Sequence, residues 1–486
     1  MSPFEDVESK LGTIPRGPIV GGHTVDGPDT ISVVDPSTED VLVEIAAGGL
    51  DTAVAAVDAA ERSMPEWAAS SPRRRADVLR RAYELMVERS DALARLIVLE
   101  NGKALADARS EVAYAAEFFR WYSEEAVRLS GTVGTAPAGT NRIMVLRQPI
   151  GVSLLITPWN FPAAMATRKI GPALAAGCAV VLKPASATPL TALAIGALLA
   201  EAGVPDGVVN VVPSRQSDAL AARLLDDERV RKVSFTGSTE VGRTLLGHAA
   251  RTVVSSAMEL GGNAPFVVLG DADVEEAVAG AMVAKLRNGG SACTAANRFI
   301  VHESVADEFA AGLAARMASL TVGPGLDEGT DIGPLVNAST RDKVAELVTG
   351  ALDGGAKALV GAGAPERPGY FYLPTVLAGV PHEAPILNEE IFGPVAPVVT
   401  FSDVDEAVTL ANATEYGLVS YVYTTDLKLG LRVAERIDSG MVGLNRPVVS
   451  DPAAPFGGTK QSGLGREGGH EGMLEFTESK YIAVDW

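Results

Sequence analysis

The feature that most constrains the fold is a regular alternation of apolar runs and helical segments that begins at Gly151. The apolar runs are short and rich in β-branched residues, and they cover residues 152–157, 179–183, 208–212 and 232–235. Segments of helical length separate some of them, at residues 163–177 and 189–202. Because parallel strands need a crossover connection that is usually a helix, the alternation predicts a parallel sheet with helices on both faces.

A second series of the same kind starts near Pro265. It comprises, in chain order, a strand at 266–269, a helix at 274–288, a strand at 299–302 and a helix at 305–320. Two lobes therefore meet near residue 260. The apolar positions of residues 51–128 recur at helical spacing, so we expect this preceding segment to be helical. The predicted fold class is α/β with two Rossmann-like open-sheet lobes.

Two apolar strips lie outside these lobes. One covers residues 142–148, where arginines flank an apolar centre, and the other covers residues 476–486, which include Tyr481 and Trp486. Both fit a small β-ribbon through which copies of the chain associate, so we expect a homodimer or a homotetramer. An ordinary edge strand and a packed tail are the alternative, which the sequence leaves open.

The charge balance restricts the ligands. Lys and Arg number 41 against 61 Asp and Glu, which gives a net charge of −20. A chain this acidic repels phosphate backbones and anionic membranes, so we expect neither nucleic acid nor a membrane as a partner. An anionic small ligand would have to be captured by a local cluster of Arg or Lys.

Cysteine usage and the first residues indicate a reducing compartment. The two cysteines, Cys178 and Cys293, are too few for a disulfide framework. Residues 1–10 are polar and acidic, without the basic flank and apolar run of a secretory signal. The longest apolar stretches, such as 190–200, are shorter than the roughly 20 residues that span a bilayer. We therefore expect a cytoplasmic protein.

Three polar side chains occupy positions suited to chemistry. Cys293 lies in a loop of small residues, where a tight turn could expose a nucleophilic thiol. Glu259 follows a predicted strand at 253–257 and could act as a general base, and Asn160 lies in a proline-flanked turn that could aim its amide at an oxyanion. Each has an ordinary alternative: a small buried hydrophobe, a solvated acid, and an Asx turn or helix cap. Cys178 lies among core residues and is interpreted as buried.

Three cations and one glycine motif could bind anions. Lys183 ends a predicted strand, and Arg168 and Arg287 lie in apolar or small-residue surroundings. A solvated lysine and structurally paired arginines are the alternatives. The segment 235–242 follows a strand, so its N–H groups could face a pyrophosphate or simply cap a helix. The G-x-G-x-x-G spacing at 463–468 lacks a preceding strand and is rejected as a dinucleotide fingerprint.

Together these segments resemble the aldehyde dehydrogenase family over nearly the whole chain. Seven stretches match in order, at residues 158–162, 183–185, 235–239, 259–262, the Cys293 loop, 390–394 and 455–458. The resemblance implies that Cys293 attacks an aldehyde, that Asn160 and the Cys293 N–H hold the oxyanion, and that Glu259 activates the water that releases the acid. By the same resemblance, Glu467 matches a second glutamate associated with proton or water relay.

The resemblance also implies a nicotinamide dinucleotide. Its binding residues by position are Thr157, Pro158, Trp159, Lys183, Ala185, Ser186, Phe235, Gly237, Ser238, Glu390 and Phe392. NAD-selective relatives commonly place Glu where Ser186 stands, and Ser186 beside Lys183 removes the repulsion of a 2′-phosphate. We therefore predict that NADP and NAD are both accepted, with NADP preferred. No metal site is predicted.

Within the family the chain most resembles succinate-semialdehyde dehydrogenases. Those enzymes hold the far carboxylate of the substrate with two arginines and a serine, which correspond to Arg168, Arg287 and Ser450. This is the cationic cluster that the net charge requires, and it predicts a small-molecule aldehyde that carries a carboxylate. Arg446, in the loop of Ser450, is either a further contact or an outward-facing rim residue.

Two positions depart from patterns seen in the family. Ser291 stands where many members have Gln, two residues before the nucleophile, so the hydrogen bonding of this loop is expected to differ. Ala295 stands where some relatives carry a second cysteine that forms a disulfide with the nucleophile, so no such redox switch is expected.

The resemblance assigns domains to the lobes. We expect a cofactor-binding domain from 1–128 and 149–258, to which 446–467 returns, a catalytic domain at 259–445, and an oligomerisation ribbon and tail at 129–148 and 468–486.

The nearest alternative function is the same chemistry on glutarate semialdehyde or an aromatic aldehyde, because one methylene changes binding by only about 1–3 kcal/mol. An alternative of another class is a non-redox thiol esterase or structural binder.

Overall fold

The first lobe is built on an eight-stranded sheet. In the computed structural model, which describes residues 2–485, its strands lie in the order β2 (His23–Thr24), β1 (Ile19–Val20), β9 (Val209–Val211), β8 (Val180–Lys183), β7 (Val152–Ile156), β10 (Val230–Thr236), β11 (Ser255–Glu259) and β21 (Gly463–Leu464). The strands from β9 to β11 are parallel, as the alternation predicts, and β1 and β21 run antiparallel to their neighbours. The carboxyl ends of the parallel strands therefore share one edge of the sheet.

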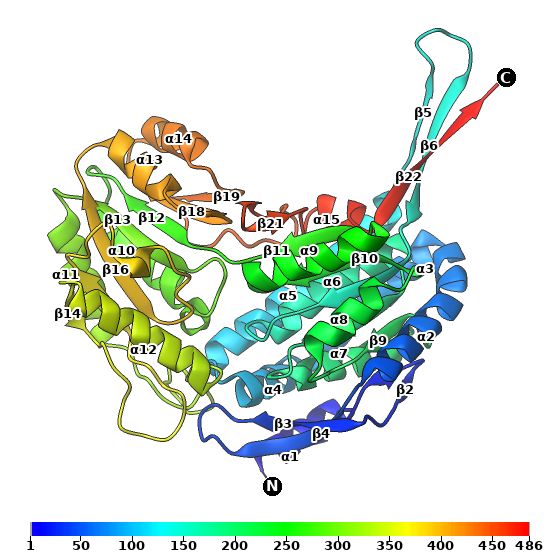
Figure 1. The fold of residues 1–486 in the computed structure, drawn as a ribbon, viewed down its shortest axis with the longest axis horizontal. Helices are drawn as coiled ribbons and strands as arrows, with labels where there is room; N and C mark the ends of the chain where they lie inside the picture. Colours follow the sequence, from blue (N-terminus) through cyan, green and yellow to red (C-terminus); the bar gives the residue numbers. More distant parts are fainter. Residues whose placement is uncertain (1, 486) are drawn as a thin grey trace.

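Helices cover both faces of this sheet (Figure 1). One face carries α2 (Leu50–Ala69), α8 (Ser217–Leu225) and α9 (Thr239–Thr252), and the other carries α6 (Pro162–Ala176) and α7 (Pro189–Glu201), with α3 (Pro72–Glu88), α4 (Ser90–Asn101) and α5 (Leu105–Glu125) packed outside them. Successive residues of β7 show the reason: Leu154 packs in the core under α2 and α8, whereas Leu155 packs in the core under α6.

The second lobe has the same design. Its seven-stranded sheet has the order β14 (Lys357–Val360), β15 (Thr375–Ala378), β16 (Val395–Phe401), β13 (Ala296–His302), β12 (Ala264–Val268), β18 (Val419–Tyr423) and β19 (Met441–Leu444), and β14 is antiparallel to β15 while the other pairs are parallel. Two apolar cores lie on opposite faces. One involves α10 (Val274–Leu286) and α11 (Ala306–Ala318), and the other involves α12 (Ala338–Asp353), α13 (Val404–Asn412) and α14 (Leu427–Arg436).

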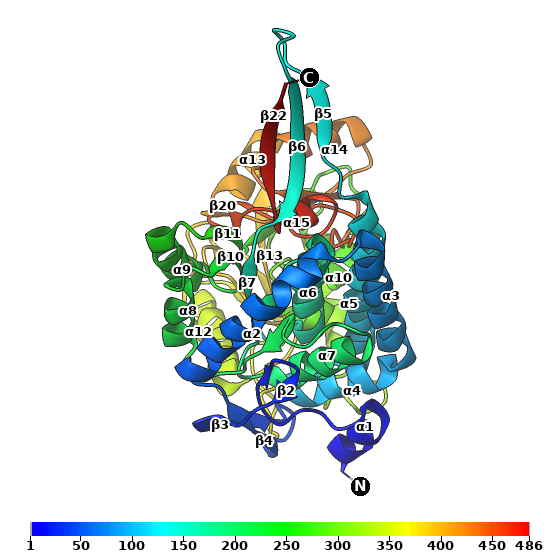
Figure 2. The same ribbon diagram turned by 90° about the vertical axis from the view of Figure 1, so that its right-hand side faces the viewer.

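A three-stranded ribbon projects away from both lobes (Figure 2). It consists of β22 (Thr477–Val484), β6 (Arg142–Pro149) and β5 (Thr132–Thr135), and both pairs are antiparallel. The two apolar strips of the sequence are thus adjacent strands of one sheet, with Val484 opposite Arg142. Trp486 of the predicted tail lies outside the described residues.

The remaining elements are short. They are α1 (Pro3–Leu11), the hairpin of β3 (Asp29–Val34) and β4 (Val41–Ala47), the pair β17 (Tyr416–Gly417) and β20 (Thr459–Lys460), α15 (Glu471–Leu474), and 3-10 turns at Ala126–Arg128, Arg287–Gly290 and Pro385–Leu387. Within residues 2–485, none of the helices has the length and apolar character needed to cross a bilayer.

Two boundaries near the site differ from the prediction. The helix expected at 274–288 ends at Leu286, and a 3-10 turn replaces its last part. The strand expected at 253–257 covers Ser255–Glu259, because Val253 takes a left-handed conformation (φ 56°) that ends α9. Glu259 is therefore the last residue of the strand and does not follow it.

Candidate active site

A cavity of about 220 Å³ lies where the two lobes meet. Its walls come from the loops after β7, β10 and β11 in the first lobe and from residues 287–294 and 390–392 in the second. This is the carboxyl edge of a parallel sheet, where ligands bind in open α/β folds. The predicted site residues that line it are Pro158, Trp159, Asn160, Arg168, Gly237, Ser238, Arg287, Cys293, Glu390, Phe392 and Ser450.

The other predicted site residues do not line this cavity among the described residues: they are Thr157, Lys183, Ala185, Ser186, Phe235, Glu259 and Glu467. Glu259 and Glu467 are buried. Phe235 belongs to the core under α2, and its ring lies where a Cβ on Gly237 would fall. Lys183 and the residues after it lie at the end of β8, the strand beside β7.

The loop that carries Cys293 is shaped by the abrupt end of α10. In the 3-10 turn Arg287–Gly290, Asn288 takes a left-handed conformation with φ 58°. Its side-chain amide donates to the carbonyl oxygens of Asn160 and Ser291, each at 2.8 Å. The loop is thereby fastened to the turn after β7, and Cys293 faces the cavity between the lobes.

Burial dominates the acidity of the Cys293 thiol and raises its pKa to about 12. Arg168 and, more weakly, Arg287 lower this pKa, while Glu390 and Glu259 raise it. In the described arrangement the thiol is therefore protonated at neutral pH, and a base has to take its proton before the sulfur can attack.

Asn160 is held in place by a buried ion pair that the sequence did not reveal. Its side-chain amide donates to the Ser291 carbonyl oxygen at 3.0 Å, which leaves the second amide hydrogen for a ligand. The main-chain carbonyl oxygen of Asn160 accepts from Lys103 Nζ at 2.7 Å, and Lys103 also pairs with Glu111 at 2.5 Å. Glu111 in turn accepts from the Ala163 N–H at 2.8 Å, so this pair fixes the start of α6.

Four buried charged groups form a layer next to the cavity. Glu467 pairs with Arg168 Nε and Lys169 Nζ, both at 2.5 Å. Although burial opposes it, Lys169 and Arg168 lower the pKa of Glu467. Burial, and then the charge of Glu467, raise the pKa of Glu259, whose carboxylate oxygens have no hydrogen-bond partner among the described residues. Glu467 is therefore the ionised member of the pair and Glu259 the protonated one.

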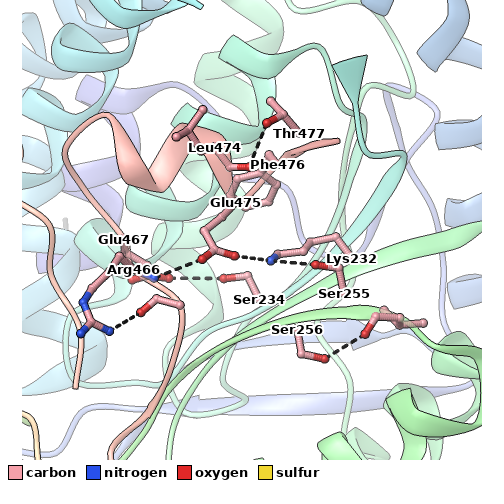
Figure 3. A network of polar contacts seen from close by, with 12 residues as sticks. Lys232, Ser234, Ser255, Ser256, Arg466, Glu467, Leu474, Glu475, Phe476 and Thr477 are labelled. Atoms are coloured by element: carbon pink, nitrogen blue, oxygen red, sulfur yellow. Dashed lines mark hydrogen bonds and ion pairs between the residues drawn. The ribbon is translucent and has the colours of Figure 1, made fainter. Parts of the chain in front are cut away.

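The segment that carries Glu467 is anchored to the first sheet, as Figure 3 shows. Ser234 on β10 donates to Glu467 at 3.3 Å. Lys232 on the same strand donates to Glu475 at 2.6 Å, and Glu475 accepts from the backbone N–H of Arg466 at 3.3 Å. The residue before Glu467 and the residues just before β22 are thus fixed to one strand.

The two predicted carboxylate-binding arginines reach the cavity with their flat faces against aromatic rings. Arg168 lies 4.2 Å from the ring centre of Phe456. Arg287 lies 5.2 Å from that of Phe161 and 5.7 Å from that of Tyr114, a residue that the sequence analysis did not single out. Arg168 directs its Nε to Glu467, whereas the guanidinium of Arg287 has no carboxylate within 4.0 Å among residues 2–485, so its N–H groups can bind a ligand. Arg446 is exposed and donates to the Val448 carbonyl oxygen, so it is a rim residue.

The opposite wall carries Glu390, Phe392 and Trp159. Glu390 accepts from the Gly262 N–H at 3.0 Å, and the rings of Trp159 and Phe392 meet edge to face at 5.5 Å. Burial raises the pKa of Glu390 to about 7, against the N–H of Gly262 and the charge of Lys285. Lys285, which sequence reasoning also missed, is fully buried and donates to the carbonyl oxygen of Ile391 at 3.3 Å.

The groups beyond this wall suit a dinucleotide. Ser238 caps α9 and lines the cavity, and the buried Thr236 hydroxyl has no partner among residues 2–485. At the end of β8, burial lowers the pKa of Lys183 to about 8, and the Ser186 hydroxyl donates to the Ser214 carbonyl oxygen at 3.0 Å. The aromatic pair fits the nicotinamide ring and the Glu390 carboxylate fits its ribose. The start of α9 fits the diphosphate, and the buried Lys183 fits the second ribose.

A cysteine-bearing loop between two Rossmann-like lobes, facing such a wall, is typical of a nicotinamide-dependent oxidoreductase of the aldehyde dehydrogenase type. The Aldehyde dehydrogenase family model matches residues 24–482, and the chain belongs to this family. Its members oxidise aldehydes with NAD(P)+ through a catalytic cysteine. Family membership decides against a non-redox thiol esterase or structural binder.

Relatives within the family carry more specific names. The chain is 55% identical to a succinate-semialdehyde dehydrogenase of Paenarthrobacter nicotinovorans, over 91% of this chain and 99% of that protein. It is 47% identical to an NADP(+) succinate-semialdehyde dehydrogenase of Escherichia coli, over 94% of each, and 47% identical to a glutarate-semialdehyde dehydrogenase of Pseudomonas putida, over 94% and 95%. A solved succinate-semialdehyde dehydrogenase of Burkholderia pseudomallei superimposes with a TM-score of 0.96 at 44% identity, over 97% of this chain and 98% of that one.

Proposed function

We propose that this chain oxidises succinate semialdehyde to succinate with NAD(P)+. The observation that carries the proposal is that Arg168 and Arg287 line the same cavity as Cys293. Two guanidinium groups can bind a carboxylate through charge-assisted hydrogen bonds, which a plain alkyl aldehyde cannot accept. The relatives named succinate-semialdehyde dehydrogenase, at 47% and 55% identity, support the same substrate.

In the proposed reaction the Cys293 sulfur attacks the aldehyde carbon to give a thiohemiacetal. Its oxyanion accepts hydrogen bonds from the free amide hydrogen of Asn160 and from the Cys293 N–H. When bound, NAD(P)+ supplies the acceptor for the hydride that leaves this carbon. The thioester left on Cys293 is then attacked by water, which releases succinate and restores the thiol.

Glu259 and Glu467 are proposed to handle the protons. A carboxyl group whose pKa is raised by burial is a stronger base once ionised, so Glu259 suits the removal of a proton from water or from the thiol. Its side chain does not line the cavity and has to turn toward Cys293 to act. Glu467, held between Lys169 and Arg168, is placed to relay the proton away from Glu259.

On the cofactor side, we propose that Glu390 and Phe392 hold the nicotinamide ribose and ring, that Trp159 and Ser238 contact the diphosphate, and that Lys183 binds the adenosine ribose. Ser186 beside Lys183 leaves room and positive charge for a 2′-phosphate, so NADP is the preferred cofactor and NAD is also accepted. Replacing Ser186 with Glu should shift the preference toward NAD by about tenfold, measured as the ratio of kcat/KM values for the two nucleotides.

Glutarate semialdehyde is the second candidate substrate. A cavity of about 580 Å³ adjoins the catalytic cavity and shares Tyr114, Arg287 and Ser450 with it. A substrate longer by one methylene could extend toward this space, and two relatives are named glutarate-semialdehyde dehydrogenases, at 45% and 47% identity.

The wider organisation is also proposed. Residues 1–128 and 149–258, with residues 446–467, would form the cofactor-binding domain, residues 259–445 the catalytic domain, and residues 129–148 and 468–486 an oligomerisation element. The ribbon of β5, β6 and β22, which projects from both lobes, supports a homodimer or homotetramer. The absence of a bilayer-spanning helix in residues 2–485 and the scarcity of cysteine support a reducing, cytoplasmic location.

The experiment that tests the proposed function follows nucleotide reduction by absorbance with three aldehydes: succinate semialdehyde, glutarate semialdehyde and butanal, which replaces the carboxylate of succinate semialdehyde with a methyl group. We expect the highest kcat/KM with succinate semialdehyde. A higher value with glutarate semialdehyde would favour the second candidate, and a preference for butanal would reject both.

A further inference from the structure

Tyr114 carries a buried hydroxyl with an unmet hydrogen bond. It lies on α5, where its ring packs edge to face against Phe118 at 4.9 Å. The hydroxyl oxygen is inaccessible to solvent and has no hydrogen bond of good geometry among residues 2–485. The Arg168 guanidinium is near enough to act on it as a donor, so it is the hydroxyl hydrogen that lacks an acceptor. Buried polar atoms without partners are uncommon in native proteins, and one that faces a cavity is the expected mark of a missing ligand.

The surroundings of this hydroxyl are positive. Burial raises the pKa of Tyr114, the charges of Arg168 and Arg287 lower it, and Glu467 raises it more weakly. Arg168 uses its Nε for Glu467, which leaves its outer nitrogens on the cavity side, near Met165. Arg287 has no carboxylate within 4.0 Å of its guanidinium in the part of the chain that the structure describes.

The position of Tyr114 in the cavity system is equally specific. Tyr114, Arg287 and Ser450 each line both the catalytic cavity and the larger cavity that adjoins it. These three residues therefore lie between the two spaces. Of the two cavities, Arg168 lines only the catalytic one, so all four residues border the space that holds Cys293.

We propose that the Tyr114 hydroxyl is a further donor to the far carboxylate of the substrate and a determinant of specificity. The inference rests on the proposed function. A carboxylate has about four lone-pair sites, so it can accept from Tyr114 as well as from Arg168, Arg287 and Ser450. A methyl group in the same place offers the hydroxyl no acceptor. Tyr114 therefore adds to binding only when the substrate carries the carboxylate.

The test compares Tyr114→Phe with Thr236→Val. Each substitution removes one buried hydroxyl that has no hydrogen bond of good geometry among residues 2–485, and both residues line the same cavity, but Thr236 lies on the cofactor side. For Tyr114→Phe we expect kcat/KM with succinate semialdehyde to fall by about 10- to 100-fold and the value with butanal to change less than about threefold. Thr236→Val should leave the ratio of the two values unchanged.

Two measurements separate a binding role from a packing role. Succinate, used as an inhibitor, should bind Tyr114→Phe more weakly by a similar factor. The melting temperature should stay the same or rise, because the substitution removes an unsatisfied buried group. A parallel fall with both aldehydes, or a large drop in melting temperature, would mean that Tyr114 is structural and would overturn the inference.

An Arg287→Ala arm distinguishes this inference from the function on which it rests. If Arg287→Ala impairs succinate semialdehyde selectively but Tyr114→Phe does not, the carboxylate-binding site stands and the role of Tyr114 is wrong. If neither variant discriminates between the two aldehydes, the proposed substrate class fails with it.

Discussion

The two walls of the catalytic cavity balance their buried charges in different ways. On the cofactor wall, Glu390 and Lys285 compensate each other: burial raises the pKa of Glu390 and lowers the pKa of Lys285, each to about 7, and each charge opposes the shift of the other. On the substrate wall, Arg287 has no carboxylate within 4.0 Å among residues 2–485, and Arg168 shares Glu467 with Lys169.

This difference indicates where each wall obtains its missing charge. A wall that is balanced in itself can receive a ligand through hydrogen bonds and stacking. Asp107 compensates Arg287 only at longer range, so the N–H groups of this guanidinium can bind an anion directly, and here that anion would arrive as part of the substrate. Because the net charge of the chain is −20, an anionic substrate is repelled by most of the protein and needs this local positive charge to bind.

The largest effect is expected at Cys293, which lies between the two walls and is needed for the reaction itself. Cys293→Ala should lower kcat by more than about 10⁴-fold with every aldehyde, because Cys293 is the only thiol among residues 2–485 that lines the cavity. Nucleotide binding, measured by quenching of protein fluorescence, should stay within about twofold of the wild type. Substantial residual turnover would contradict the assigned nucleophile.

Arg287→Ala tests the substrate wall. We expect a loss of about 100-fold in kcat/KM with succinate semialdehyde and a much smaller change with butanal, since the guanidinium binds the carboxylate and acts only weakly on the Cys293 thiol. Arg446→Ala is the matched control, because Arg446 is an exposed arginine of the loop that also carries Ser450. An equal effect of the two variants would contradict a role for Arg287 in carboxylate binding that the exposed Arg446 lacks.

The two thiols should respond differently to pH when an alkylating reagent is added. Burial raises the pKa of both Cys293 and Cys178, but only Cys293 of the two lines the cavity. Because the thiolate reacts and the pKa of Cys293 lies far above neutrality, its alkylation rate should rise about tenfold per pH unit from about pH 7 to pH 9. Peptide mapping by mass spectrometry should find Cys178 unmodified; a plateau near neutral pH would contradict the raised pKa of Cys293.

Glu390→Gln tests the cofactor wall and should have the smallest effect. We expect the KM for NADP to rise by about tenfold, equally with both aldehydes, because the amide is a weaker acceptor for ribose hydroxyls. With a pKa of about 7, the wild-type carboxylate ionises as the pH rises through neutrality, so its KM for NADP should fall between about pH 6 and pH 8. A variant with the same pH dependence as the wild type would assign that ionisation to another group.

Much of the fold could be predicted because its periodicity is local. The strands β7, β8, β9 and β10 and the helices between them follow from apolar runs and helical spacing. The hairpin of β3 and β4 was missed, since few of its residues are buried and its clearest alternation, at residues 30–33 of β3, is very short. The end of α10 was placed too late, because the left-handed conformation of Asn288 leaves little trace in sequence.

The candidate site was predicted less evenly. Cys293, Asn160 and both arginines lie where the family resemblance placed them, at one cavity. The Lys103–Glu111 pair that fixes Asn160 was not found, because it joins a loop to a helix and then to a distant turn. Tyr114 was missed because an aromatic residue four positions before Phe118 is typical of ordinary helix packing.

The most direct test of the central claim is the ratio of kcat/KM for succinate semialdehyde to that for butanal in the wild-type protein, measured with NADP. The substrates differ in whether the far end is a carboxylate or a methyl group, so the ratio measures how strongly the substrate wall selects a carboxylate. We predict a ratio above about 100. A ratio near one would show that Arg168, Arg287 and Tyr114 do not select a carboxylate, and would contradict the proposed substrate while leaving the aldehyde dehydrogenase chemistry in place.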